Sequence, residues 1–349
     1  MLLDGLNIVV TGGTGSLGKM LIRRLMTGEL GRPRKILVFS RDELKQHEMR
    51  ISWHQAKLAI EDLRDFSAED VLEFHIGDVR LYDTLLSVLR KADIVIGAAA
   101  LKQVPQCEYF PFEAVRTNVE GTHNLIRAIR EHGLDVQKVI TISTDKACKP
   151  VNAMGMTKAL QERLIISANL DYPGTHFMAV RYGNVVASRG SVVPHFQNQI
   201  DSGGPVTVTS AEMTRFLLTL DQAVDTVFEA LRSGQPGDTL IPQVPSARVI
   251  DIARSMINGR PIDIQVIGVR PGEKIHEILI SEEECGRTSE RNGYYVIHSV
   301  IPEIGSHSRP LVRDSEYSSC ETLMSGEDIH RLLQDAGFCG GSVHARSDV

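Results

Sequence analysis

A glycine-rich turn near the start of the chain is the feature that most constrains its fold. The apolar run at residues 8–10 leads directly into Thr-Gly-Gly-Thr-Gly-Ser-Leu-Gly at residues 11–18, and a helical pattern follows from Ser16. These glycines permit a tight turn, close approach to a pyrophosphate and close helix packing, and the helix N-terminus adds N–H donors. The turn predicts a dinucleotide site; an ordinary βα turn is the alternative. The predicted contacts are Thr11, Gly12, Thr14, Gly15, Ser16 and Gly18.

The first half of the chain alternates short apolar runs with helical patterns such as residues 114–131. The runs are residues 8–10, 36–39, 72–76, 94–96 and 139–142. Strands that are buried on both faces are apolar along their whole length, and helices between them are typical of a parallel sheet. We therefore predict an α/β fold with a doubly wound parallel sheet, a Rossmann domain, over residues 1–185.

The alternation of apolar runs and helical patterns ends after Arg-Tyr-Gly-Asn at residues 181–184, where glycines, prolines and polar loops become frequent. We predict a smaller α/β substrate-binding domain at residues 186–339. A segment near 212–242 is expected to return to the first domain with a helix, and residues 340–349 are expected to form a flexible tail.

Composition excludes several classes of protein. The net charge of −6 argues against broad nucleic-acid binding, which needs a basic face. The five cysteines are scattered and lack CxxC spacing, which favours a reduced chain over a disulfide framework or zinc site. His75, His195 and His276 show no metal-ligand spacing, so no metal is expected. We find no signal peptide, and the apolar stretch 94–101 is too short to span a bilayer, so we expect a cytoplasmic protein without stable membrane insertion.

The end of the second predicted strand bears on the choice of cofactor. An acidic residue there usually meets the ribose hydroxyls of NAD, whereas an arginine accommodates the 2′-phosphate of NADP. Ser40 and Arg41 therefore favour NADP, with NAD as the alternative. In that alternative Arg41 is solvated and Asp42 only caps the next helix.

Two later segments carry a resemblance to a known superfamily. Ser-Thr-Asp-Lys at residues 143–146 ends the fifth predicted strand, and Asn-Ala-Met-Gly-Met-Thr-Lys occupies residues 152–158. Together with the glycine turn, they resemble the extended short-chain dehydrogenase/reductase superfamily. That group normally carries a tyrosine four residues before a lysine. Here Lys158 is present, but Met154 stands at the tyrosine position.

Further segments narrow the resemblance to the UDP-N-acetylglucosamine 4,6-dehydratases, over residues 5–280. These segments are 98–105 (AAALKQVP), 181–185 (RYGNV), 213–216 (MTRF) and 270–274 (RPGEK). They are more similar to the configuration-inverting branch than to the retaining, membrane-anchored branch. The resemblance implies a lyase that acts on a UDP-sugar for bacterial surface polysaccharide or glycan synthesis. It also implies a homo-oligomer, either a dimer or a hexamer.

The resemblance also implies catalytic roles. Hydride leaves sugar C4 for the nicotinamide, a base removes the C5 proton, the C6 hydroxyl leaves as water, and hydride returns to C6. Lys146 would be the C5 base and Asp145 the acid, and an adjacent carboxylate and ammonium tune each other's proton affinity. Thr144 would hydrogen-bond near O4, and Lys158 would hold the nicotinamide ribose. The alternative for Asp145 and Lys146 is a surface ion pair.

Met154 departs from the superfamily pattern. A thioether has no proton to exchange and is a weak acceptor, so it cannot deprotonate O4. Lys146, Asp145 or a bound water takes over that task, or the oxidation step is lost. Some active dehydratases of this group resemble this chain in having methionine here. The alternative is that Met154 only fills the core of a decayed site.

The remaining expected contacts come from residue type and from the resemblance together. Guanidinium groups suit phosphate and a carboxylate suits ribose hydroxyls. The expected substrate contacts are Lys102, Asn184, Val193, Arg215, Arg270 and Glu273. The expected further cofactor contacts are Asp78, Val79, Ala98 and Ala99. Asp78 has a second interpretation as the N-cap of the helix from Leu81.

Three alternative functions stay open at this point. A retaining dehydratase or a UDP-sugar 4-epimerase would use the same scaffold, although epimerisation does not need Asp145 and Lys146. A non-catalytic NADP-sensing protein would be compatible with Met154.

Overall fold

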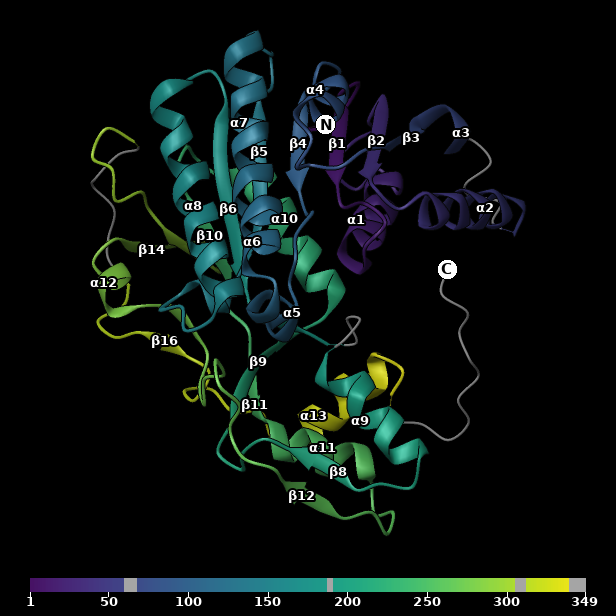
Figure 1. Ribbon diagram of the computed structural model, residues 1–349, viewed down its shortest axis with the longest axis vertical. Helices are drawn as coiled ribbons and strands as arrows, with labels where there is room; N and C mark the ends of the chain where they lie inside the picture. The colour runs from purple at the N-terminus through teal and green to yellow at the C-terminus, as the bar shows by residue number, and fades with distance from the viewer. Residues whose placement is uncertain (60–67, 187–190, 305–311, 339–349) are drawn as a thin grey trace.

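A nine-stranded, mostly parallel sheet forms the larger part of the molecule (Figure 1). This computed structural model describes residues 1–59, 68–186, 191–304 and 312–338. The strands, in spatial order, are β14 (Thr288–Arg291), β15 (Tyr294–Ile297), β10 (Thr239–Pro242), β6 (His176–Tyr182), β5 (Lys138–Thr144), β4 (Ile94–Gly97), β1 (Asn7–Thr11), β2 (Lys35–Ser40) and β3 (Leu72–Ile76). From β10 to β3 every pair is parallel. The order 3-2-1-4-5-6 is that of the Rossmann fold, so the predicted fold class is confirmed.

Helices cover both faces of this sheet. On one face lie α4 (Tyr82–Leu89), α7 (Gly121–His132) and α8 (Ala153–Asp171), and on the other lie α1 (Ser16–Met26) and α10 (Leu220–Ser233). The side chains of β1 alternate between them, since Ile8 and Val10 pack in the core with α1 and α10, whereas Val9 packs with α4 and α7. Burial on both faces explains why the central strands are largely apolar. The helix α2 (Glu43–Ala59) and the four-residue helix α3 (Ala68–Val71) lie between β2 and β3 in the chain.

The helix expected at residues 114–131 is interrupted. Short helices α5 (Val104–Tyr109) and α6 (Pro111–Ala114) precede a π-helical turn, η2 (Val115–Glu120), and α7 follows. The buried amide of Asn118 accepts a hydrogen bond from Leu101 N at 2.9 Å and donates to Leu101 O at 3.0 Å. These bonds hold the turn against the loop after β4. The helix predicted at residues 114–131 is therefore present, and the π-helical turn within it was not predicted.

A smaller lobe lies below the large sheet in Figure 1. Its elements are β7 (Asn184–Val185), α9 (Val192–Asp201), β8 (Val206–Val208), β9 (Thr214–Leu218), β11 (Ser246–Arg248), α11 (Val249–Ile257), β12 (Ile264–Val266) and α13 (Gly326–Asp335). Phe196, Ile252 and Leu333, from three of its helices, belong to a separate hydrophobic core. Two further elements, β13 (Ile278–Ile280) and β16 (Tyr317–Ser318), pair with each other, and α12 (Glu282–Cys285) follows β13.

The chain returns to the large sheet twice after residue 186. Within the expected return segment, α10 packs on the large sheet and β10 joins it, but β9 belongs to the small three-stranded sheet. The second return was not predicted, because β15 and β14 pair beyond β10 although their residues fell in the expected substrate domain. Val296 and Ile297 are buried in the core of the large sheet, which accounts for this pairing. The expected tail at 340–349 lies outside the described residues.

A buried ion-pair network ties the sheet to the second half of the chain. Arg181 on β6 contacts Glu162 on α8 at 2.6 Å and Glu284 on α12 at 2.7 Å. Burial opposes ionisation of Glu284, but Arg181 outweighs it and lowers the pKa of Glu284 to about 2. Among the described residues, the helices are all too short or too polar to cross a bilayer.

Candidate active site

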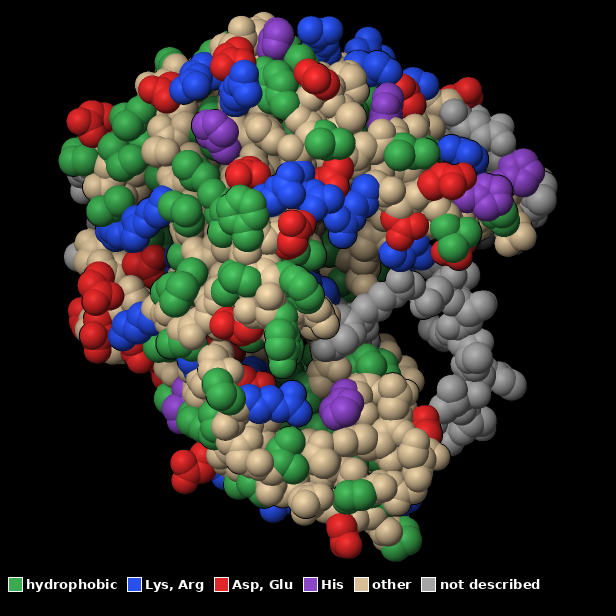
Figure 2. All heavy atoms as spheres, viewed as in Figure 1, with side chains coloured by type: hydrophobic (Ala, Val, Ile, Leu, Met, Phe, Trp, Pro, Cys, Tyr) green, Lys and Arg blue, Asp and Glu red, His purple; other side chains and the backbone are tan. Residues whose placement is uncertain are grey.

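A large cavity of about 1050 Å³ opens at the carboxyl ends of β1, β4 and β5, between the large sheet and the smaller lobe. The surface is hollowed between these two parts of the molecule (Figure 2). In doubly wound folds ligands bind at this edge, where the strand order reverses between β1 and β4. The cavity is therefore the candidate active site.

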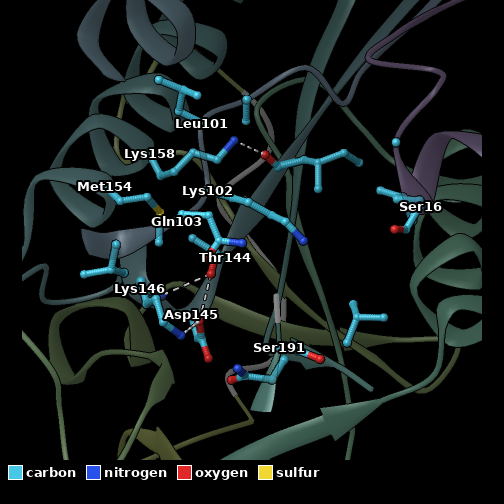
Figure 3. A pocket seen from close by; sticks show the side chains of 18 of the residues that line it. Ser16, Leu101, Lys102, Gln103, Thr144, Asp145, Lys146, Met154, Lys158 and Ser191 are labelled. Atoms are coloured by element: carbon cyan, nitrogen blue, oxygen red, sulfur yellow. Dashed lines mark hydrogen bonds and ion pairs between the residues drawn. The ribbon is translucent and has the colours of Figure 1, made fainter. Parts of the chain in front are cut away.

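The glycine turn forms one wall of this cavity. Gly12 has a φ of +67°, and a Cβ there would lie 2.7 Å from the Ala99 nitrogen. A Cβ on Gly18 would lie 2.6 Å from the Gly12 oxygen, so only glycine allows α1 to pack against the turn. Gly15 is the N-cap of α1 and provides no side-chain bond, and Gly15 and Ser16 line the cavity (Figure 3). The turn thus presents backbone at a helix N-terminus to the cavity.

Thr11 is the one residue of the predicted turn contacts that does not line the cavity. It is buried, and its hydroxyl accepts a hydrogen bond from Ala99 N at 3.3 Å. Its position ties the end of β1 to the loop after β4. The expectation that Thr11 contacts the cofactor is therefore replaced by a structural role.

Ser40, Arg41, Asp78 and Val79 line the far end of the cavity. The Arg41 guanidinium is 59% exposed and lies 3.8 Å from the Asp78 carboxylate. Asp42 accepts a hydrogen bond from Lys45 N at 3.0 Å, as a cap of α2 would. Arg41 is thus solvated and Asp42 caps α2, as in the NAD alternative, yet Arg41 also faces the cavity.

Asp78 does not cap α4. The N-cap of α4 is Leu81, which provides no side-chain bond, and the Asp78 carboxylate binds the Arg80 guanidinium at 2.6 Å. Burial raises the pKa of Asp78, but the hydrogen bonds from Arg80 outweigh it and lower that pKa overall. The capping interpretation of Asp78 was therefore wrong.

Three polar residues meet at the end of β5, where the chain enters the 3₁₀ turn η3 (Asp145–Ala147) (Figure 3). The Thr144 hydroxyl donates to Asp145 Oδ1 at 2.8 Å. Lys146 Nζ lies 3.1 Å from the same oxygen and 3.0 Å from Glu277 Oε1. Asp145 is fully buried, and its Oδ2 has no hydrogen-bond partner within the described residues. The pair is therefore not a surface ion pair.

Burial and charge shift the proton affinities of this group. Burial raises the pKa of Asp145 even though Lys146 opposes it. Burial alone would lower the pKa of Lys146, but Asp145 and Glu277 reverse this and raise it. Burial likewise opposes ionisation of Glu277, but Lys146 and Arg215 outweigh it and lower the pKa of Glu277. Asp145 is thus the carboxyl of the group that most readily holds a proton.

Lys158 and Met154 lie one turn apart on α8 and face the cavity (Figure 3). Lys158 Nζ donates to Ile142 O and to Gln161 Oε1, each at 2.6 Å, and burial lowers the pKa of Lys158 to about 8. Met154 is 3% exposed and packs with Cys107 and Ala114. Met154 therefore belongs both to a small core and to the cavity wall.

Five of the six expected substrate contacts line the opposite side of the cavity. They are Lys102, Asn184, Arg215, Arg270 and Glu273. Val193 does not line it, because it is buried in the core of the smaller lobe, while its neighbours Val192 and Pro194 face the cavity. The expectation for Val193 was wrong, since helical geometry turns every third or fourth side chain inward.

The sequence analysis missed Glu277 in the cavity wall and Asn118, which does not line the cavity but holds the loop after β4. Glu277 follows the Arg-Pro-Gly-Glu-Lys segment by three residues, and no spacing rule connects it to Lys146. Asn118 was assigned to the middle of an expected helix, but its amide also donates to Thr157 on α8 at 3.0 Å. Among the described residues, no three His, Cys, Asp or Glu side chains are grouped closely enough to hold a metal ion.

Comparison with known families agrees with this geometry. A family model described as polysaccharide biosynthesis protein matches residues 8–299 of the chain. The chain belongs to this polysaccharide biosynthesis protein family. The match includes the glycine turn, the end of β5 and the segment up to Glu277.

Members and neighbours of this family carry several names. An uncharacterized membrane protein of Methanocaldococcus jannaschii is 40% identical over 343 residues, covering 95% of this chain and 96% of its own. A UDP-glucose 4-epimerase of Rickettsia typhi is 42% identical over 333 residues, covering 94% and 89%. The structure of Pen from Bacillus thuringiensis is 34% identical with a TM-score of 0.84, covering 97% of this chain and all of Pen.

A more distant structure shows the same fold. DesIV, a dTDP-glucose 4,6-dehydratase from Streptomyces venezuelae with NAD bound, is 19% identical with a TM-score of 0.64, covering 77% of this chain and 87% of its own. This chain therefore shares its fold with a nucleotide-sugar dehydratase.

Proposed function

We propose that this protein is an NADP-dependent lyase that dehydrates UDP-N-acetylglucosamine to a UDP-4-keto-6-deoxy-N-acetylhexosamine with inversion at C5. The observation that carries the proposal is the buried set of Thr144, Asp145 and Lys146, which shares one cavity with the glycine turn. A proton donor and a proton acceptor within 3.1 Å of each other suit an elimination, in which one proton leaves carbon and another joins the leaving oxygen.

The cofactor proposal depends on the fit of the cavity wall to a dinucleotide. A Cβ at Gly12 or Gly18 would clash with backbone atoms, so the turn leaves room for a pyrophosphate only with glycine. The N-terminus of α1 faces the cavity, and the Arg41 side chain is exposed enough to meet a 2′-phosphate. Lys158 is held by Ile142 on β5 and Gln161 on α8, in a position suited to a ribose. NAD is the alternative cofactor. Titration of NADP and NAD into wild type and Arg41→Ala decides between the two cofactors, because only the affinity for NADP should weaken in the variant.

When bound, the nicotinamide supplies the chemistry of hydride uptake from C4 and hydride return to C6. The residues of the chain handle the protons. The O4 proton has a path through the Thr144 hydroxyl to Asp145 Oδ1, 2.8 Å away, which replaces the route that Met154 cannot offer. Lys146 removes the C5 proton, and Asp145 passes its proton to the departing C6 hydroxyl. A proton from solvent then reaches C5 from the opposite face of the ring, as inversion requires, so that the sugar loses one water overall.

Lys146 must be a neutral amine before it acts as a base. Its resting ammonium lies within 3.1 Å of two carboxylates, Asp145 and Glu277. The raised pKa of Asp145 favours uptake of the O4 proton, because burial disfavours its charged form, so Asp145 does not also receive the proton of Lys146. The Lys146 proton passes to solvent through the cavity, which Lys146 lines.

Substrate turnover in heavy water tests the proposal. We expect UDP-N-acetylglucosamine to lose water and to gain deuterium at C5, with the L-arabino configuration seen by NMR. Retention of the D-configuration would instead support a retaining dehydratase. Absence of turnover together with tight NADP binding would support a sensing protein and contradict the proposal.

A UDP-sugar 4-epimerase is the second candidate, because the Rickettsia relatives carry that name at about 42% identity. Epimerisation at C4 needs no elimination across C5 and C6, so the Asp145–Lys146 pair favours the dehydratase. Recovery of the C4 epimer without loss of water from UDP-glucose or UDP-N-acetylglucosamine would decide for the epimerase. A cytoplasmic location, a role in bacterial surface polysaccharide synthesis and self-association as a dimer or hexamer remain predictions.

A further inference from the structure

Glu277 is a buried carboxylate that joins two parts of the site. It is 2% exposed, and its Oε1 lies 3.0 Å from Lys146 Nζ and 3.7 Å from Arg215 Nε. Lys146 extends from the end of β5, and Arg215 belongs to β9 of the smaller lobe. One carboxylate oxygen therefore contacts the proposed base and a proposed diphosphate contact from two different elements.

The backbone around Glu277 is fixed on both sides. Its N–H donates to the Ser319 hydroxyl at 2.9 Å, and its carbonyl accepts from Ser319 N at 2.8 Å. By contrast, its second carboxylate oxygen, Oε2, is buried without a hydrogen-bond partner within the described residues, although Glu277 lines the cavity. Burying such an oxygen without a hydrogen bond costs free energy. This indicates that the Glu277 carboxylate contributes through its charge rather than through packing.

Several charged groups face Lys146 from the elements packed around it. Asp145 precedes it in the chain, Glu277 precedes β13, Arg215 approaches from β9, and Lys274 interacts electrostatically with Lys146, Asp145 and Glu277. Arg215 also donates to Thr214 O at 2.7 Å, so it does not depend on Glu277 alone for its position. Removal of Glu277's charge would leave Lys146 with Asp145 as its one contacting carboxylate among the described residues.

We propose that Glu277 is a positioning residue that holds Lys146 and Arg215 on one carboxylate, and thereby links the proton affinity of the base to anion binding in the same cavity. The proposal rests on the proposed function, since it concerns the proposed base Lys146 together with Arg215, an expected substrate contact whose guanidinium suits a phosphate. An anion bound at Arg215 neutralises the guanidinium charge that partly offsets the charge of Glu277. The Glu277 carboxylate then stabilises the Lys146 ammonium more strongly.

The test uses Glu277→Gln, which keeps a side-chain oxygen but removes the charge. Without the second carboxylate the Lys146 ammonium is less stabilised, so Lys146 should titrate at a pH lower by about 1 or more. NMR of protein with ¹³C-labelled lysine measures this directly, with the Lys146 signal assigned by its loss in Lys146→Arg. UDP should bind about threefold or more tightly to Glu277→Gln by calorimetry, because a negative charge near the diphosphate is gone.

Glu229→Gln is the matched control. Glu229 is also buried, on α10, and it accepts a hydrogen bond from Asn292 at 2.7 Å, but it does not line the cavity. It should change neither the Lys146 titration nor UDP affinity. If the wild type dehydrates UDP-N-acetylglucosamine, the rising limb of kcat against pH should also move to lower pH in Glu277→Gln alone.

The outcomes separate the two proposals. An unchanged Lys146 titration in folded Glu277→Gln, or the same shift in Glu229→Gln, would overturn the role of Glu277. Unchanged or weaker UDP binding in Glu277→Gln would overturn the link to anion binding. Absence of turnover by the wild type would overturn the dehydratase, while the NMR titration would still test the hold of Glu277 on Lys146.

Discussion

At the scale of single residues, the proposed chemistry depends on Lys146, which is enclosed by Asp145 and Glu277. We predict that Lys146→Ala lowers dehydration of UDP-N-acetylglucosamine by about 10²-fold or more, as removal of a general base typically does. NADP affinity should stay unchanged, because Lys146 lies at the end of β5 and not at the glycine turn. Turnover by mass spectrometry and NADP titration measure the two effects. Near-normal turnover in the variant would exclude Lys146 as the base.

Met154 supports the second prediction at this scale. If its thioether takes no part in proton transfer, Met154→Leu should keep most of the turnover and lose less than about 1.5 kcal/mol of unfolding free energy, because the two side chains have similar volumes. Steady-state kinetics and urea unfolding check both quantities. A fold that is preserved while kcat collapses would show that the sulfur itself is needed.

Most of the expected site residues line the cavity, and those that the sequence missed or misplaced have a physical explanation. Asp145 and Lys146 were expected from the family resemblance and from their place at the end of a central parallel strand, and Arg215 from its residue type and the resemblance. Glu277 was not, since its contact with Lys146 spans 131 positions of sequence and arises where β13 lies against the turn η3. Val193 was misplaced by one helical position.

At the scale of elements, the turn between β1 and α1 requires glycine for packing as well as for ligand approach. A Cβ at Gly18 would lie 2.6 Å from backbone atoms of Gly12 and Gly13, which no side-chain movement relieves. We predict that Gly18→Ala costs about 1–3 kcal/mol of unfolding free energy and weakens NADP binding, because α1 must move away from the turn. Urea unfolding and NADP titration measure the two losses.

Gly174→Ala is the control for that prediction. A Cβ at Gly174 would meet no atom within 4 Å, and its φ is not positive. The variant should stay within about 0.5 kcal/mol of the wild type. Equal losses in both variants would mean that the general cost of replacing glycine, and not the packing of α1, is measured.

Strands and helices of the first half were predictable because the central part of most strands is apolar and helical patterns separate them. The π-helical turn η2 was not, since it depends on hydrogen bonds from Asn118 to Leu101 that connect distant parts of the chain. β14 and β15 were missed for a similar reason. They are four residues each and have polar neighbours, and only the pairing of β15 with β10 and of β14 with β15 makes them strands of the large sheet.

At the scale of the whole molecule, Arg181 joins the sheet, α8 and α12 through Glu162 and Glu284. The pKa of Glu284 is lowered from 4.5 to about 2, so its stabilising effect is present above pH 4.5 and is lost as the pH falls toward 2. The shift corresponds to about 3 kcal/mol. We predict that Glu284→Gln is less stable than the wild type at pH 7 but loses less stability between pH 4.5 and 3.

Urea unfolding at several pH values measures this difference. Glu282→Gln provides the control, because Glu282 is 73% exposed and contacts Lys149 at 3.7 Å on the surface. Its unfolding free energy should follow the wild type at every pH. Parallel pH curves for Glu284→Gln and the wild type would show that other carboxyls cause the acid sensitivity.

The two returns of the chain to the large sheet make the dinucleotide-binding half inseparable from the rest. A fragment ending at residue 185 would lack α10, β10, β15 and β14. The backbone of β6 would become an open edge, and Met178 and Val180, which pack under α10, would meet water. Such an edge recruits other chains. Gene fusion or domain exchange can therefore transfer this cofactor-binding half only together with the late segments that complete it.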